Sequence, residues 1–317
     1  MTVGDRDGKF ESLWFGAALL PGGWASSVRL SLAEGHIAAI ETDAPREPGE
    51  PAYGLAVPGL PNLHSHAFQR GMAGLAEARG PGADSFWTWR EAMYRFVDRL
   101  GPEDLEAIAA QAYVEMLESG FTRVGEFHYL HHDPRGEPYA NPAEMAERLA
   151  AAAHEVGIGL TLLPVFYAHS GFGGAAPGEG HRRFVHDLDS FARLLQASGA
   201  ALSHLADARL GAAPHSLRAV TEAELTAVAA MTPGPLHIHV AEQEREVEEC
   251  LAWSGQRPVA WLLDRVEIDR RWCLVHATHM IPAEIAALAA SGAVAGRSPI
   301  TEGKLAAGDS PEETALL

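Results

Sequence analysis

The stretch PGLPNLHSHAFQRG, residues 58–71, decides the expected fold. It places His64 and His66 two residues apart at the end of the apolar run AVPGLPNL. Residues i and i+2 of a strand face the same side of a sheet, so both imidazoles can point at one spot above the carboxyl end of a buried strand. Two neutral imidazoles that converge suit Zn²⁺ or a similar divalent cation. The alternative is a pair of surface histidines in a loop.

Composition excludes several classes of protein. The chain has 317 residues, of which 47% are hydrophobic and 21% charged, as in globular proteins, and this length allows one large α/β barrel or two smaller domains. The net charge of -18 argues against a nucleic acid or an anionic membrane surface as partner. No run approaches the ~20 apolar residues of a membrane span, and the first residues, MTVGDRDGKFESLW, contain no apolar stretch of the kind a signal peptide has. Cys250 and Cys273, without a C-x-x-C motif, indicate a reducing compartment, so we expect a cytoplasmic protein.

The order of apolar runs predicts an α/β protein. Residues 11–44 resemble short strands, residues 44–54 a linker rich in proline and glycine, and from residue 55 strands alternate with helices. We expect strands at 55–63, 121–127, 159–167, 206–213, 235–241, 272–277 and 293–296. We expect helices at 102–118, 142–156, 182–198, 221–231, 242–253, 257–264 and 282–290. Such repeats favour a (β/α) barrel over residues 55–317, preceded by a β segment at 1–54. The absence of G-x-G-x-x-G weakens a dinucleotide-binding interpretation.

Histidines follow several of the expected strands, at the end where barrel active sites lie. The fifth strand ends in HIHVAEQE, with His239 and, three residues beyond it, Glu242. The sixth strand ends at His276, and the fourth leads to His215 and Arg218. With the two histidines of the first strand, four strand ends carry a histidine, which predicts a metal-dependent hydrolase. A carboxylate such as Glu242 can move protons without binding the metal.

Other polar residues keep plainer interpretations. His237 is expected to be packed or to support a ligand rather than to bind metal itself. Glu126, at the end of the second strand, is either a packing partner or a site residue. Five further histidines are expected at the surface: His131, His132, His154, His181 and His186.

Several motifs together resemble the formimidoylglutamate deiminases of the amidohydrolase superfamily, enzymes of histidine degradation. They are PNLHSHAFQRGMAGLAE, FWTWREAMYR, EFHYLHH, APHSLRAV, HIHVAEQEREVEEC and LVHATH, which follow one another in this order, and the resemblance as a whole runs from about residue 10 to about 305. HSHAFQR together with FWTWRE is specific to that family, whereas H-x-H and H-x-x-E are shared across the superfamily. The resemblance implies a (β/α)8 barrel of the TIM type with a small N-terminal β-sandwich segment.

The resemblance also implies roles for individual residues. His64, His66 and His239 would bind one Zn²⁺, or another divalent metal, and Glu242 and His276 would be catalytic. Five residues match positions that hold the substrate: Gln69, Arg90, Tyr129, His215 and Arg218. The expected reaction is hydrolysis of N-formimino-L-glutamate to N-formyl-L-glutamate and ammonia. Guanidinium groups at positions 90 and 218 suit the two carboxylates of that substrate.

Two other functions stay open. The chain could be a related amidohydrolase that deaminates another substrate, such as an aminated heterocycle, although the two arginines argue against it. It could also be no enzyme, but a barrel fragment that folds poorly or serves only as a binding or interaction protein. The expected partner is a small anionic substrate, and a homodimer is possible.

The C-terminal residues depart from the family pattern. Where the family has a PTTEANLGDG-like loop and an eighth strand ending in a metal-binding aspartate, residues 298–317 read SPITEGKLAAGDSPEETALL. Asp309 comes too early to be that ligand. The resemblance therefore implies a truncated barrel, without its eighth strand or fourth metal ligand and open between the first and seventh strands. We expect such a chain to be weakly soluble and nearly inactive.

Overall fold

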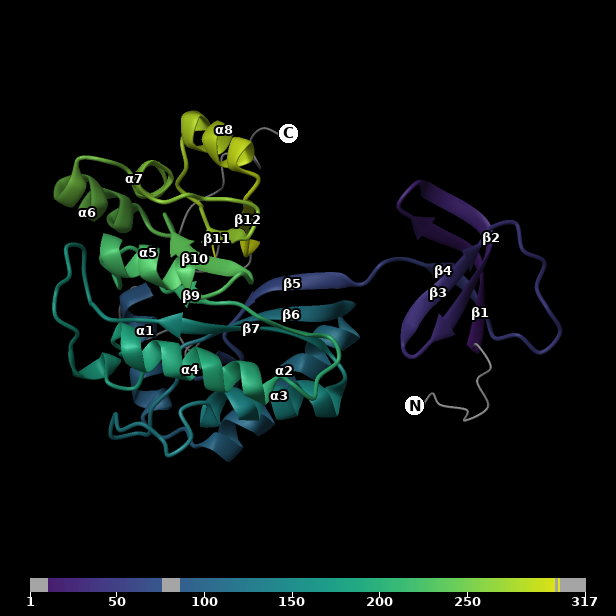
Figure 1. Cartoon of the computed structure of the whole chain (residues 1–317), viewed down its shortest axis with the longest axis horizontal. Helices are drawn as coiled ribbons and strands as arrows, with labels where there is room; N and C mark the ends of the chain where they lie inside the picture. The colour runs from purple at the N-terminus through teal and green to yellow at the C-terminus, as the bar shows by residue number, and fades with distance from the viewer. Residues whose placement is uncertain (1–10, 76–85, 300–301, 303–317) are drawn as a thin grey trace. The chain divides into compact units, whose positions relative to one another are not determined.

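The computed structural model describes residues 11–75, 86–299 and 302, and at residues 11 and 86–91 it describes the backbone alone. The chain divides into two compact units, Met1–Leu60 and Pro61–Leu317 (Figure 1). Within the described residues, no helix is long and apolar enough to cross a membrane.

The first unit is a four-stranded sheet in the order β3-β2-β1-β4. Its strands are β1 (Glu11–Leu20), β2 (Gly23–Ala33), β3 (His36–Glu41) and β4 (Ala52–Ala56). The first three pair as antiparallel neighbours, whereas β4 runs parallel to β1 and places Ala52 opposite Trp14. The Arg29 guanidinium forms a 2.7 Å ion pair with Glu50, which joins the segment before β4 to β2. The described part of the predicted β-sandwich segment is thus one layer.

The first strand expected for the barrel, residues 55–63, is wrong in its boundaries. The structure has β4 at Ala52–Ala56 and a separate strand β5 at Leu60–Ser65. Pro58 and Gly59 lie between them, and proline lacks the backbone N–H that a continuous ladder needs. Residues 52–54 belong to a strand rather than to the predicted linker, because they pair with β1.

The second unit contains the parallel strands that alternate with helices. They are β5, β6 (Phe121–His128), β7 (Gly159–Phe166), β8 (Ala208–Leu210), β9 (Ala213–Pro214), β10 (Leu236–Val240), β11 (Trp272–His276) and β12 (Val294–Gly296). They form two groups of hydrogen-bonded strands. The first has the order β5-β6-β7-β8, with β9 also paired to β7, and the second has the order β10-β11-β12. Two bridges, Ala212 to Leu236 and Ser216 to His239, link the two groups. Among the described residues no ladder joins β12 to β5, so the barrel is open there.

Helices connect these strands and lie beside them (Figure 1). They are α1 (Phe86–Val97), α2 (Pro102–Glu118), α3 (Glu144–Val156), α4 (Leu188–Ala201), α5 (Glu222–Ala230), α6 (Glu244–Ser254), α7 (Pro258–Arg265) and α8 (Pro282–Ser291). All seven predicted helices are confirmed, and α1 was not predicted as one. Helix α4 begins later than expected because Asp187 caps it by accepting the backbone N–H of Ser190. Thr221 and Glu224 form a capping box at α5.

Burial differs between the strands that carry the histidines. Every residue of β10 and β11 is buried, as their continuous apolar sequences predict. Strand β5 is instead an edge strand with Leu60 exposed, so the expectation of a buried first strand is wrong. Its last residue, Ser65, is buried, and the histidines on either side of it point inward.

Candidate metal centre and active site

Three imidazoles from distant parts of the chain meet at the carboxyl ends of β5 and β10. The Nε2 atom of His64 lies 3.0 Å from that of His66 and 3.1 Å from that of His239. Ligands around tetrahedral zinc at 2.0–2.1 Å stand about 3.3 Å from one another, and these two separations are close to that value. Among the described residues, the three histidines whose ring nitrogens all lie within 4.8 Å of one another are His64, His239 and His276, and His66 joins this group through His64.

Backbone carbonyls hold two of these rings from behind. The Nδ1 atom of His66 donates to the Phe127 carbonyl at 2.8 Å, and that of His239 donates to the His215 carbonyl at 3.0 Å. A proton on Nδ1 leaves the lone pair on Nε2, which then faces the other histidines. Metal-binding histidines are commonly oriented in this way.

Burial keeps the three rings neutral, as metal binding requires. It lowers the pKa of His66 to about 4. Burial, reinforced by neighbouring histidines, also holds the pKa values of His64 and His239 well below the usual range. A proton therefore does not compete for these nitrogens near neutral pH.

His276, at the end of β11, joins the same cluster but faces carboxylates. Nitrogen atoms of His64, His239 and His276 lie within 4.8 Å of one another. The Nε2 atom of His276 is 3.7 Å from Glu242 Oε1, and its Nδ1 atom is 3.4 Å from Glu302 Oε1. Because both nitrogens face a carboxylate, this ring is better placed to handle a proton than to bind a metal.

Glu246 fixes the turn that presents Glu242. Its carboxylate accepts the backbone N–H groups of Ala241 and Glu242, both at 3.1 Å. Glu246 is buried in the first turn of α6, and its Oε2 atom lies 4.0 Å from the guanidinium of Arg218. It thus links the predicted catalytic carboxylate to a predicted substrate-binding arginine.

Four of the five residues expected to bind substrate can be placed. Gln69 donates to the Tyr129 hydroxyl at 3.1 Å. The ring of His215 lies 5.8 Å from that of Tyr129 and 4.9 Å from that of His239. The side chain of Arg218 is 16% exposed; partial burial opposes its charge, but Glu246 and Glu242 outweigh this and raise its pKa. The side chain of Arg90 lies outside the described residues.

Sequence reasoning missed some residues and misplaced others. Glu246 and Glu302 contact the site but were not predicted as site residues, although Glu246 lies within the motif HIHVAEQEREVEEC and Glu302 within the segment compared with the PTTEANLGDG-like loop. His131, His181 and His186 are buried, so the expectation of surface positions is wrong for these three. His154 is exposed as expected.

Glu126 supports the turn after β5. It is 1% exposed, and its Oε1 atom accepts the backbone N–H of Ala67 at 2.7 Å, directly after His66. Burial raises the pKa of Glu126 to about 7. Of its two expected roles, the contacts support packing and positioning.

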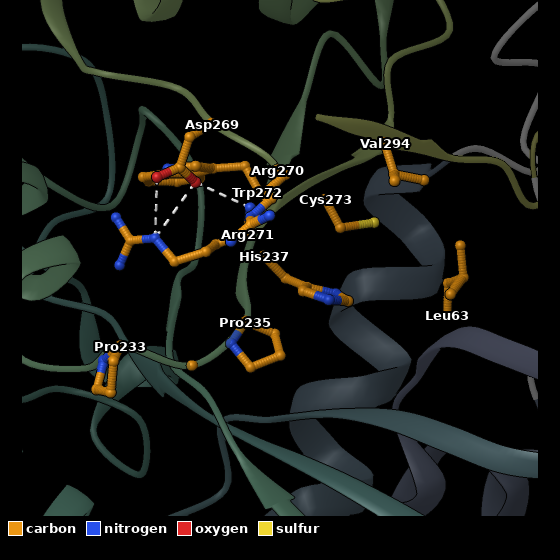
Figure 2. A pocket seen from close by; sticks show the side chains of 11 residues that line it. Leu63, Pro233, Pro235, His237, Asp269, Arg270, Arg271, Trp272, Cys273 and Val294 are labelled. Carbon is orange, nitrogen blue, oxygen red and sulfur yellow. Dashed lines mark hydrogen bonds and ion pairs between the residues drawn. The ribbon is translucent and has the colours of Figure 1, made fainter. Parts of the chain in front are cut away.

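A pocket of about 600 Å³ lies at the opposite, amino ends of β10 and β11 (Figure 2). His237 lines it beside Cys273, and Asp269 pairs there with Arg271 at 3.0 Å. His237 is buried below the cluster and is not among the histidines that converge there. Its burial agrees with the packed alternative of the two expected for it, and the pocket is separate from the candidate active site.

Comparisons with known proteins give a consistent result. A sequence model of the amidohydrolase family matches residues 55–308, and one described as the N-terminal domain of formimidoylglutamate deiminase HutF matches residues 13–52. Formimidoylglutamate deiminase of Pseudomonas aeruginosa is 54% identical over 93% of this chain. A 5-methylthioadenosine/S-adenosylhomocysteine deaminase of Halobacterium salinarum is 29% identical over 87% of it. The chain spans 65% and 58% of the length of these two relatives.

Solved structures show the same fold. The crystal structure of an amidohydrolase from Brucella melitensis is 57% identical, with a TM-score of 0.93 over 97% of this chain and 69% of that one. An adenosine deaminase from Xanthomonas campestris, solved with bound zinc, is 23% identical, with a TM-score of 0.71 over 95% of this chain and 65% of that one. The second likeness concerns the fold alone.

Proposed function

The chain belongs to the amidohydrolase family, and from this premise we propose that it hydrolyses N-formimino-L-glutamate to N-formyl-L-glutamate and ammonia. The observation that carries the reaction class is the contact of His64 Nε2 with the Nε2 atoms of both His66 and His239, beside the Glu242–His276 pair. The likeness to the Pseudomonas deiminase supports the choice of substrate.

We assign His64, His66 and His239 to one zinc ion. Three neutral imidazoles leave further coordination positions open, as in catalytic zinc sites. When bound, zinc would supply a Lewis acid and an activated water. The chain's own contribution is to bring the three histidines together and to fix the required tautomer of His66 and His239 through their bonds to backbone carbonyls.

The two carboxylates of the proposed substrate need positively charged side chains as binding partners. Arg218 offers a forked guanidinium whose charge is only partly balanced by Glu246 at 4.0 Å, so a carboxylate can complete its coordination. The matching position of Arg90 would hold the second carboxylate. Gln69, Tyr129 and His215 contact one another beside His66 and His239, and they would orient the formimino group.

Proton transfer is assigned to Glu242 and His276. Water adds its oxygen to the formimino carbon, and the bond from this carbon to its terminal nitrogen then breaks. Glu242 accepts the two protons of the attacking water in turn and delivers both to the terminal nitrogen, so that this nitrogen departs as ammonia and the oxygen stays as the formyl carbonyl. His276 stabilises the charge that develops at the tetrahedral carbon.

The test is ammonia release from N-formimino-L-glutamate by the zinc-loaded protein, followed with a coupled glutamate dehydrogenase assay. S-adenosylhomocysteine serves as the comparison substrate, because a deaminase of that class would release ammonia from it instead. Turnover of formiminoglutamate that disappears in Glu242→Gln would support the proposal. Turnover of the nucleoside alone would refute the substrate assignment. A single zinc per chain, a homodimer and a cytoplasmic location stay predictions.

A further inference from the structure

A second ion-pair system lies behind His276, on the side away from the proposed zinc ligands. The buried carboxylate of Glu302 is 3.4 Å from His276 Nδ1 and 2.8 Å from Arg297 Nη2. The backbone N–H of Ser298 donates to the same carboxylate at 2.9 Å. Glu302 is 3% exposed, so these three groups replace most of its contact with water.

The backbone that carries His276 is unusual. His276 and Ala277 have φ values of 67° and 49°, in the left-handed region that L residues seldom adopt. Arg297 donates from Nη1 to the carbonyls of both residues, at 3.2 and 3.4 Å. One arginine therefore holds both the strained turn beneath His276 and the carboxylate that faces its ring.

The charges on Glu302 and Arg297 are maintained in this environment. Burial alone would raise the pKa of Glu302, but its bonds to His276 and Ser298 and the charge of Arg297 outweigh burial and lower it. An ionised carboxylate is the stronger acceptor for an imidazole N–H. The ring nitrogen that faces Glu302 is therefore the one expected to carry a proton.

We propose that Glu302, held by Arg297, is a positioning residue that keeps a proton on Nδ1 of His276 and aims its Nε2 atom at the reacting centre. The ring then has one orientation, with Nε2 toward Glu242 at 3.7 Å. Without Glu302 the ring can rotate or change tautomer, and Nε2 is no longer fixed. The consequence for turnover rests on the proposed function, whereas the consequence for the ring does not.

Ring ¹⁵N spectra of the whole chain labelled at histidine test the inference directly. The His276 signals are identified by their loss in His276→Gln. We expect a protonated Nδ1 in the unaltered protein and a shift toward the Nε2–H tautomer in Glu302→Ala. In Glu302→Gln, whose amide oxygen can still accept, the Nδ1 proton should be partly retained. An unchanged His276 signature in Glu302→Ala would overturn the proposal.

Measurements of kcat distinguish a positioning role of Glu302 from a purely structural one. We expect kcat per bound zinc to fall about 10–100-fold in Glu302→Ala and less in Glu302→Gln, with KM nearly constant. A matched control is Glu222→Gln, which removes an exposed ion pair with Arg265 and should leave kcat unchanged. Loss of thermal stability with an unchanged kcat would assign Glu302 a structural role only. If the unaltered protein does not turn over formiminoglutamate, the proposed function fails and the ring spectra still decide this inference.

Discussion

Zinc affinity should be almost independent of pH between pH 7.5 and 5.5, because the proposed ligands are already deprotonated. An ordinary histidine, with a pKa of about 6.5, is about 90% protonated at pH 5.5, which weakens metal binding about tenfold. Three ordinary histidines would therefore lose about a thousandfold in affinity over this range.

The buried cluster behaves differently. With a pKa of about 4, His66 is only about 3% protonated at pH 5.5. Burial also keeps the pKa values of His64 and His239 well below their usual range, so protons compete only slightly with zinc for all three rings. We expect the dissociation constant for zinc to rise less than about threefold between pH 7.5 and 5.5, and to rise steeply only at more acidic pH.

Equilibrium dialysis with elemental analysis at each pH measures this constant without a competing chelator. His239→Ala removes one ligand and should weaken binding strongly at every pH. The matched control is His154→Ala, an exposed histidine of α3 that should change nothing. A loss approaching a thousandfold by pH 5.5 in the unaltered protein would refute the assignment of buried, neutral ligands.

Three further predictions concern stability and substrate binding. Burial lowers the pKa of His186 to about 3 in the folded protein, so the unfolded chain binds a proton first as pH falls and the folded state loses stability below about pH 6.5. His186→Gln should flatten the dependence of the unfolding free energy on pH, measured in urea, by about 1.4 kcal/mol per pH unit between pH 6 and 4; an unchanged slope would contradict the burial of a neutral ring. Arg218→Ala should lower kcat/KM for formiminoglutamate by an amount equivalent to about 2–5 kcal/mol of activation free energy, while the zinc content stays constant. A variant with the same kcat/KM as the unaltered protein would favour a substrate without carboxylates. Gly211→Ala should lower the unfolding free energy by about 1–3 kcal/mol, because the added Cβ would meet the Pro235 carbonyl oxygen and, at 2.7 Å, Leu163 Cδ2; a normal melting temperature would show that β10 can move aside.

The regular elements of the second unit could be predicted from local sequence. Apolar runs such as LHIHV and WCLVH have the composition of strands buried on both faces, and they became β10 and β11. Helix ends were predicted where a signal was local, as with Pro102 in α2. Prediction failed where pairing was decided at a distance, since residues 52–56 form a strand only because β1 lies beside them.

The residue types of the candidate site were also present in the sequence. The sequence showed the H-x-H spacing, a histidine at four of the seven expected strand ends and a carboxylate three residues after His239, and the two-residue period of a strand together with parallel order places such residues at one end of a sheet. These patterns indicated that His64, His66, His239 and His276 would share one end of the sheet, and the structure confirms that they do.

Only the tertiary structure decided how that chemistry is supported. The carbonyls of Phe127 and His215 that orient two imidazoles belong to other strands, and no side-chain pattern marks them. Glu246 and Glu302 matter through what they face across the fold. Burial sets the charge state of each histidine, and burial depends on how the whole chain packs. The sequence by itself therefore determined which groups could react, whereas their tautomers, charges and mutual orientation depend on contacts between residues far apart in the chain.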